Sequence, residues 1–179
     1  MPIAGVIASS ISGHLQTSNF FLISQSLPSA VSSITFSSIP STYKSLQVRF
    51  NLVTGGSNNL NVQFNGDTST SDYAIHRLTG NGSAAAAGGF ATGSAGYIEV
   101  LHIGTIITYP NVGIIDILDY ANTNKNKTVK SLTGANQNSS SGVIEIDSGF
   151  WLSTAAITSL TLNANGPTFT GTVSLYGVS

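Results

Sequence analysis

Four residues that could do chemistry lie close together in one stretch of the chain, NGDTSTSDYAIHRL at residues 65–78. They are Asp67, Asp72, His76 and Arg77, and they stand out because charged residues make up only 7% of the sequence. Carboxylates beside an imidazole can hold a metal ion or transfer protons. One interpretation is therefore a metal or acid–base site built from Asp67, Asp72 and His76.

The same stretch is also typical of a structured turn. Asn65-Gly66 after an apolar run is a strong signal for a two-residue turn, because both residues tolerate positive φ. Asp67 would then bond the loop backbone, as Asp does in turns. On a following strand, His76 and Arg77 would point to opposite faces, because side chains alternate along a strand. The pair could not reach one site, and the turn is the favoured interpretation.

The other histidines and acids show no spacing typical of a reactive centre. His14 and His102 are far apart in the chain, and no His-x-His or Glu-x-x-His pattern occurs. His102 stands among apolar residues, so we expect it in the core or in an interface. Asp116 and Asp119 would fall on opposite faces of a strand, which excludes a carboxylate pair for glycoside chemistry.

Glu145 and Asp147, in GVIEIDSG, share one face of a predicted strand. They could bind Ca²⁺ together with loop carbonyls, but the favoured interpretation is that they point outward as polar residues. No Gly-x-Ser-x-Gly elbow, phosphate-binding loop or dinucleotide fingerprint is present. We therefore expect no catalytic residues, no metal, no cofactor and no enzymatic activity.

The composition argues against several classes of protein. The chain has no cysteine, so disulfides and thiolate metal sites are impossible. Lys and Arg number 6 against 7 Asp and Glu, which gives no basic field for nucleic acid. No apolar run reaches the ~18 residues of a membrane span, so neither nucleic acid nor membrane is an expected partner. Because soluble proteins usually carry about 25% charged residues, little repulsion separates copies of this chain, and we expect its surface to contact other protein.

Apolar and polar residues alternate with a period of two along most of the chain, which predicts β-strands. In SLQVRFNLV, for example, Leu46, Val48 and Phe50 alternate with polar residues. NLNVQF follows after TGGSNN, and residues 45–64 are predicted to form an antiparallel hairpin. Further strands are predicted at 19–24, 32–38, 73–78, 97–103, 112–120, 128–134, 142–151, 157–162 and 171–178.

Two segments of low complexity are predicted as loops: residues 80–96, rich in Gly and Ala, and residues 134–142. Neither marks a domain boundary. Residues 1–20 lack clean alternation and are predicted to be an N-terminal arm that docks on a neighbour, or else a frayed terminus. Residues 21–179 then form a single β-sandwich domain.

Many short strands separated by turn residues predict an all-β fold in which two antiparallel sheets pack face to face. The expected architecture is an antiparallel β-sandwich, jelly-roll-like, with an extended N-terminal arm. Few charged residues guard the sheet edges, so we expect subunit contacts to cover them. The predicted core consists of Leu46, Val48, Phe50, Val62, Phe64, Ile115, Ile117, Ile144, Ile146, Leu160, Leu162 and Leu175.

Five stretches of the chain carry a shared pattern: residues 32–50, 62–82, 114–134, 149–166 and 169–178. The pattern runs from Ile34, Phe36, Ile39, Pro40 and Tyr43, through Phe64-Asn65-Gly66-Asp67 and Asp119-Tyr120-Ala121-Asn122, to Leu175-Tyr176-Gly177. In these stretches the chain resembles a group of small virion structural proteins of tailed bacteriophages, among them those of cyanophages and other aquatic phages. The shared positions are core and turn residues without a catalytic signature.

The resemblance implies a β-sandwich module of the phage virion, with two placements open. The first is a capsid decoration (cement) protein, a homotrimer that binds the major capsid protein on the outer head surface and stabilises the shell. The second is a tail fibre or tail-tip module that binds host surface glycan, through loops such as 65–73 or 80–96. The lack of heptad repeats for a fibre shaft favours cement. A hydrolytic depolymerase would need paired acids in a cleft, which the spacing does not provide.

Aromatic residues are the candidates for anchoring such contacts, because aromatics dominate interface energies. For each candidate, the alternative interpretation is an ordinary aromatic of the sandwich core. The candidate anchors are Phe20, Phe21, Tyr43, Tyr109, Trp151 and Tyr176.

Overall fold

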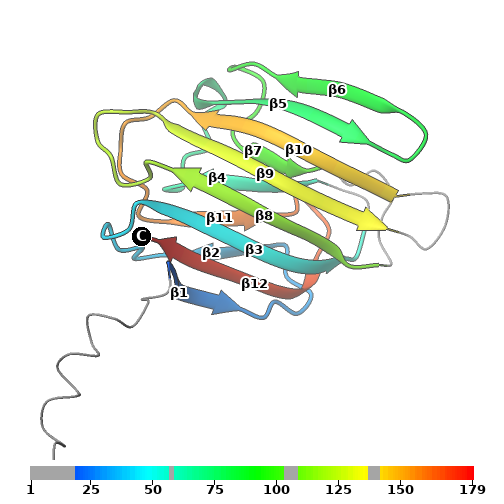
Figure 1. Ribbon diagram of the computed structural model, residues 1–179, viewed down its shortest axis with the longest axis horizontal. Helices are drawn as coiled ribbons and strands as arrows, with labels where there is room; N and C mark the ends of the chain where they lie inside the picture. The colour runs from blue at the N-terminus through cyan, green and yellow to red at the C-terminus, as the bar shows by residue number, and fades with distance from the viewer. Residues whose placement is uncertain (1–18, 57–58, 103–108, 137–141) are drawn as a thin grey trace, which may run out of the picture.

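Twelve antiparallel strands form two facing sheets in the computed structural model, which describes residues 19–56, 59–102, 109–136 and 142–179 (Figure 1). The larger sheet has the order β1-β12-β3-β8-β9-β10-β5-β6, and the smaller has the order β2-β11-β4-β7. The predicted all-β sandwich is thus confirmed. The elements are β1 (Phe20–Ser26), β2 (Ser33–Phe36), β3 (Ser45–Thr54), β4 (Leu60–Phe64), the 3₁₀ turn η1 (Thr70–Asp72), β5 (Tyr73–Gly80), β6 (Ala85–Phe90), β7 (Ile98–Leu101), β8 (Asn111–Leu118), β9 (Lys127–Asn136), β10 (Gly142–Trp151), β11 (Leu160–Asn163) and β12 (Phe169–Val178).

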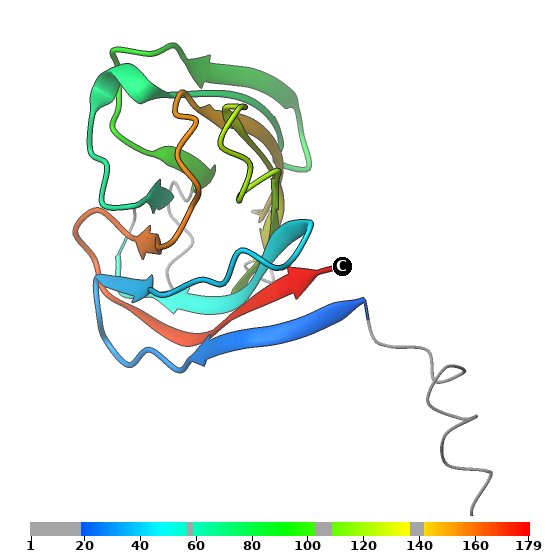
Figure 2. The same cartoon turned by 90° about the vertical axis from the view of Figure 1, so that its left-hand side faces the viewer.

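Eight of these strands have the connectivity of a jelly roll. When β5, β6, β9 and β10 are set aside, the remaining strands pair as first–eighth–third–sixth in the larger sheet. In the smaller sheet they pair as second–seventh–fourth–fifth, which completes the jelly-roll order. The four additional strands extend the larger sheet beyond β8. This longer sheet curls around the smaller one, so that its outer face is convex (Figure 2).

Every predicted strand overlaps an observed one, but the hairpin predicted for residues 45–64 is wrong. β3 lies between β12 and β8, whereas β4 lies in the other sheet between β11 and β7. Gly55, just after β3, donates its backbone N–H to the carbonyl of Thr168, not across a turn to β4. Alternation fixes which face of a strand is buried, but it carries no information on which strand lies beside it.

Strand β6 was predicted to be part of a loop. Residues 85–90 instead pair in register with β5 and form the edge of the larger sheet. Backbone pairing with β5 holds this strand in place, since its Ala and Gly residues are exposed and bury little apolar surface. Gly89 has φ of 150°, and a Cβ there would collide with the carbonyl oxygen of Ile75. Only glycine allows the two backbones to approach so closely.

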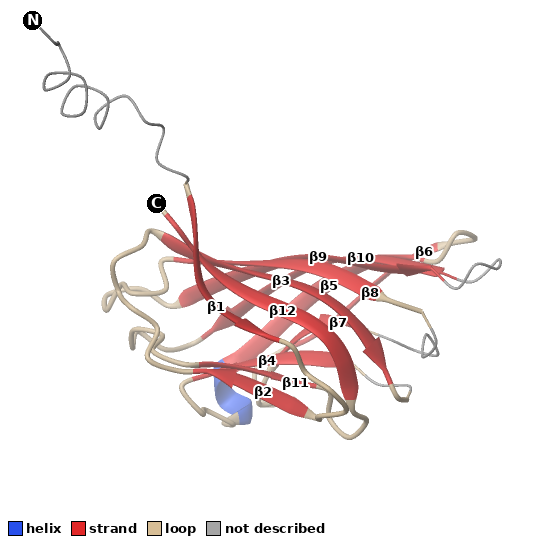
Figure 3. Cartoon of the chain, turned by 90° about the horizontal axis from the view of Figure 1, so that it is seen from below, coloured by secondary structure: helices blue, strands red, loops and turns tan. Residues whose placement is uncertain are grey.

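The two sheets face each other, as Figure 3 shows from below, and the buried hydrophobic side chains form one core between them. Ten of the twelve predicted core residues are buried, among them Val48, Phe64 and Leu160. Burying each such side chain contributes about 1.5–3 kcal/mol. The other two, Ile144 and Ile146, are 60% and 45% exposed, so the prediction was wrong for them.

The first strand begins at Phe20, which pairs with Val178 near the end of β12. The predicted arm therefore lies almost wholly outside the described residues, which begin at position 19. Within the described part of the chain, no helix is long and apolar enough to cross a membrane.

Candidate interaction surface and buried ion cluster

The turn predicted at Asn65-Gly66 is confirmed. Both residues have positive φ, 53° and 69°, and the N–H of Asp67 donates to the carbonyl of Phe64 at 2.9 Å. The Asp67 carboxylate accepts hydrogen bonds from the backbone N–H of Ser69 at 2.8 Å and from Nε1 of Trp151 at 2.6 Å. Asp67 thus ties the turn to the end of β10, a structural role.

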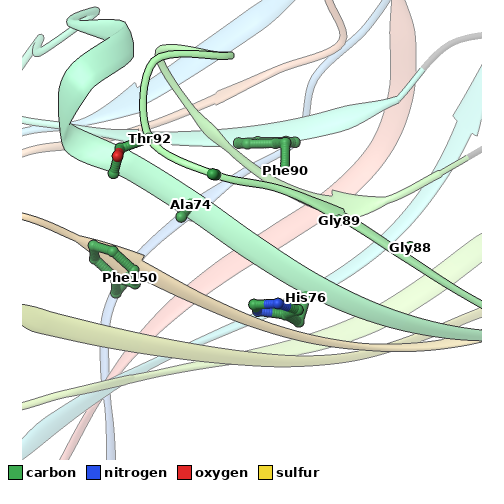
Figure 4. Close-up of a pocket in the computed structure, with 8 residues that line it drawn as sticks. Ala74, His76, Gly88, Gly89, Phe90, Thr92 and Phe150 are labelled. Atoms are coloured by element: carbon green, nitrogen blue, oxygen red, sulfur yellow. The ribbon is translucent and has the colours of Figure 1, made fainter.

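His76 and Arg77 point to opposite faces of β5, as predicted. His76 is exposed on the convex outer face, where it lines an open hollow of about 590 Å³. Figure 4 shows His76 projecting beside Phe150 of β10, with Phe90 of β6 across the hollow. Thr92 supplies the hydroxyl of this mostly apolar lining. The described residues contain no group of three or more potential ligands arranged to hold a metal ion.

Arg77 instead points into the sandwich and binds three carboxylates. Its Nη2 lies 2.5 Å from Oε1 of Glu99, which comes from β7 of the smaller sheet. Its Nε lies 3.0 Å from Oδ1 of Asp147 and 3.2 Å from Oε1 of Glu145, both on the neighbouring strand β10. These four side chains are at most 11% exposed. We call them the ion cluster, and it links the two sheets.

Further hydrogen bonds satisfy the carboxylates of the ion cluster. Ser131 Oγ donates to Asp147 Oδ2 at 2.8 Å, and Thr79 Oγ1 donates to Glu145 Oε2 at 3.2 Å. The backbone N–H of His102 donates to Glu145 Oε1 at 2.9 Å. The His102 ring lies with Nδ1 2.7 Å from Glu99 Oε1, which places His102 at the rim of the cluster.

The electrostatics of the ion cluster are unbalanced, because three carboxylates share one guanidinium. Burial, followed by the negative charge of Glu145, raises the pKa of Asp147 to about 6, although hydrogen bonds from Ser131 and Arg77 act in the opposite direction. Burial alone would lower the pKa of Arg77, but the surrounding carboxylates outweigh it and raise that pKa. Arg77 therefore remains charged.

The ion cluster overturns the expectation for Glu145 and Asp147. Both were expected to point outward, or to bind Ca²⁺, yet their side chains are 0% and 1% exposed and face Arg77. Because side chains alternate along β10, turning the acids inward turns Ile144 and Ile146 outward. The signal available in the sequence was Arg77 itself. It shares its face of β5 with Tyr73 and Ile75, both buried, so it needed buried acids as partners.

The outward-facing aliphatic side chains form a continuous patch on the convex face of the larger sheet. Ile114, Leu132, Ile146 and Leu78 are register neighbours across β8, β9, β10 and β5. We define the outer patch as Leu78, Val112, Ile114, Leu132, Ile144 and Ile146, which are between 40% and 60% exposed.

The outer patch contains a hollow where glycine replaces a side chain. The row next to the one above reads Val112, Gly134, Ile144 and Gly80 across the same four strands. Aliphatic residues and glycines therefore alternate along this row. The hollow around Gly134 measures about 750 Å³ and is walled by Val112, Leu132 and Ile144. Monomeric proteins seldom leave such a contiguous apolar surface uncovered.

The surface of the protein as a whole has no net formal charge from Lys, Arg, Asp and Glu. Five of the chain's thirteen Lys, Arg, Asp and Glu residues lie inside: the ion cluster and Lys127, which is 0% exposed. Four basic residues remain outside against four acidic ones, so the remaining charges cancel. These are Lys44, Arg49, Lys125 and Lys130, and Asp67, Asp72, Asp116 and Asp119.

The candidate aromatic anchors lie in three different places. The guanidinium carbon of Arg49 lies over both the Phe20 and the Tyr176 rings, 4.8 and 5.0 Å from their centroids. Phe21 stacks on Tyr43 at 5.8 Å.

These four rings gather at the β1–β12 edge of the larger sheet, and we call them the aromatic edge. Tyr109 is 40% exposed, ahead of β8. Trp151 is buried at 3% and belongs to the core beside Phe64 and Tyr73.

Comparison with known proteins adds no family to this description. No protein-family model matches the chain, and no curated protein matches it significantly.

Proposed function

We propose that the protein is a virion structural protein of a tailed phage, and that it acts as a capsid decoration (cement) protein on the outer surface of the head. The observation that carries the proposal is the outer patch on a surface without net charge. Such a surface is suited to burial against other protein. The assignment to a phage virion, the placement on its head and the expected trimeric state come from the resemblance to phage structural proteins.

The mechanism would be association. A specific protein contact typically buries about 1,600 Å² in total, and aliphatic side chains gain about 25 cal/mol for each Å² removed from water. Contacts repeated over a shell reinforce one another through effective concentration. A cement protein of this kind would bind the major capsid protein and hold neighbouring subunits together against internal pressure.

The ion cluster supports a structural role and offers nothing to catalysis. A general acid or base needs a carboxyl group within reach of a substrate proton. Here Glu145 and Asp147 are enclosed and bound to Arg77. Together with Arg77 and Glu99 they join the two sheets beneath the outer patch, so they stabilise the strands that carry the patch.

The hollow in Figure 4 favours a second candidate, a tail module that binds host glycan. Phe150 and Phe90 offer ring faces to a sugar, and His76 with Thr92 offers polar atoms. The lining is otherwise Ala and Gly, which provides few side-chain groups to fix a sugar's orientation.

Binding to heads and to glycans separates the two candidates. Purified protein would be mixed with expanded phage heads and, in parallel, with a panel of host lipopolysaccharides. Cement predicts saturable head binding at a fixed number of copies, which Ile146→Lys in the outer patch weakens at least tenfold. Leu27→Lys is the control, because Leu27 is 70% exposed outside the outer patch. Binding to glycan without binding to heads, lost on Phe150→Ala, would replace cement by the tail module.

A further inference from the structure

Strand β6, at the margin of the larger sheet, turns backbone hydrogen-bonding groups away from its partner strand. In the turn between β5 and β6, the N–H of Asn81 donates to the carbonyl of Ala84 at 3.1 Å. From there, bonded and non-bonded pairs alternate along an antiparallel ladder, and the register of β5 and β6 has no shift. Ala85, Ala87 and Gly89 therefore fall in non-bonded pairs, so their N–H and C=O groups point away from β5. Figure 1 shows no described strand beyond β6.

The other three edges of the two sheets are protected in ways that β6 is not. Natural sheets blunt their edges with bulges, short strands, charges or a cover. β1 has a register shift between Leu22 and Ser24, β2 has only four residues, and β7 is buried along its whole length. β6 has six residues in unbroken register, without charge or proline, and is exposed from Ala85 to Gly89. Within the described sheets, it is the edge left open to another strand.

The chemistry of β6 fits a second copy of the same strand. An added strand of foreign sequence is recognised through pockets for its alternate side chains. Residues 85–89 are all Ala or Gly, so they have no side chains that could wall such pockets. Two copies related by a two-fold axis present the same surface to each other. Because residues 85–89 carry no charged or bulky side chain, this stretch can lie against itself without like-charge repulsion.

We infer that two copies of the chain pair β6 with β6, antiparallel, about a two-fold axis at Ala87. In this register Ala87 faces Ala87 of the partner subunit, and Ala85 faces Gly89 of the partner subunit. All the outward backbone groups are then used, in about six hydrogen bonds. A register shifted by two residues would leave one of the three residues of each copy unpaired. The two eight-stranded sheets become one continuous sheet.

Pairing would also join the outer patches of the two copies. The row from Ile114 to Leu78 in the outer patch ends beside Ala87, the register neighbour of Leu78 on β6. The row therefore reaches the edge of the sheet and would continue through the two Ala87 residues into the partner subunit. The pairing goes beyond the proposed function, because its backbone hydrogen bonds require no capsid.

Single cysteines test both the contact and its register, because the chain has no cysteine of its own. Ala87→Cys would place its two copies about 5.5 Å apart between Cα atoms, a separation that a disulfide can bridge. Ala85→Cys is the matched control, since Ala85 is exposed on the same strand and the same face. Its two copies would lie about 14 Å apart in this register, too far for a disulfide.

We expect Ala87→Cys to form a cross-linked dimer at least tenfold faster than Ala85→Cys under mild oxidation, as read on a non-reducing gel. Equal rates would overturn the inference, because undirected collisions or another register would produce them. A second outcome would also overturn it: a thiol in Ala87→Cys that stays reduced in the protein alone and becomes protected only when heads are added. That result would assign the edge to a different protein.

A proline tests whether backbone groups make the contact. Because the N–H of Ala87 points away from β5, Ala87→Pro removes no hydrogen bond within the fold but deletes a donor at the two-fold axis. Ala87→Ser keeps the N–H and is the control. Pairing doubles the mass of whatever oligomer the rest of the surface forms, so sedimentation equilibrium measures it.

We expect Ala87→Pro to weaken this doubling at least tenfold and Ala87→Ser to retain it. Unchanged doubling in the proline variant, at an unchanged urea midpoint, would contradict the pairing. If the proline lowers the urea midpoint, the comparison of the two cysteine variants decides.

Head binding separates this inference from the proposed function. Saturable head binding without faster cross-linking of Ala87→Cys would leave the proposed function standing and remove the pairing. Faster cross-linking of Ala87→Cys without head binding would do the reverse.

Discussion

Arg77 and Asp147 face each other across neighbouring strands inside the sandwich, with Nε 3.0 Å from Oδ1. This pair sets the orientation of β10, because the acid that meets Arg77 fixes which residues of the strand point inward. The same orientation places Ile144 and Ile146 of β10 on the outer face, where they form part of the outer patch.

Removing Arg77 should severely destabilise the fold. Arg77→Met would leave three buried carboxylates without their guanidinium, and breaking a buried pair in this way costs about 3–5 kcal/mol. Urea unfolding monitored by circular dichroism measures the loss. Arg49→Met is the matched control, because Arg49 lies exposed on the outer face, and it should cost under about 1 kcal/mol. Similar losses for the two variants would contradict the role given to the ion cluster.

Stability should depend on the protonation of Asp147. Its pKa in the folded protein is raised to about 6, above the unfolded value of 3.8. The folded state therefore binds the proton more tightly, and this group's contribution to stability falls as pH rises from 4 through 6. Asp147→Asn removes the titrating group and keeps a side-chain oxygen for Arg77. The pH dependence of the urea midpoint between pH 4.5 and 7.5 should be flatter in the variant, and an unchanged profile would refute the assignment.

The hydrogen bond between Trp151 and Asp67 should be measurable through the single tryptophan. Asp67→Ala leaves the buried indole N–H without its acceptor, which costs about 1–3 kcal/mol. We expect a lower urea midpoint together with an altered Trp151 emission in the folded state. Asp72→Ala changes a nearby carboxylate that does not contact the indole and should leave the emission as it is. An Asp67→Ala protein with unchanged stability and emission would contradict the contact.

Gly177 should tolerate no side chain. A Cβ there would overlap the ring of Tyr43, and overpacking of this kind typically costs 1–3 kcal/mol. Gly177→Ala should lower the unfolding free energy by about that amount and disturb the stacking of Phe21 on Tyr43. Gly88→Ala provides the comparison, because a Cβ at that position meets no atom within 4 Å. Equal effects at the two glycines would count against the packing described for the aromatic edge.

The sequence predicted the strands well because alternation is local. It could not predict strand partners, and the supposed hairpin of β3 and β4 failed for that reason. β10 shows a second limit. The rule that apolar residues face inward assigns Ile144 and Ile146 to the core. The buried Arg77 on β5, which also contacts Glu99 on β7, instead turns the acidic face of β10 inward. That information is spread over three segments far apart in the chain. β6 was missed because a strand of Ala and Gly has no alternating pattern.

Strand β12 lies between β1 and β3 in the larger sheet, and this placement has a consequence for biosynthesis. On the ribosome, β1 and β3 emerge early but cannot be joined until β12 has also emerged. Closure of the sheet therefore depends on contacts between segments that are far apart in the sequence, which are slow to form. Meanwhile the nascent molecule displays unpaired strand edges, the surfaces that molecular chaperones protect.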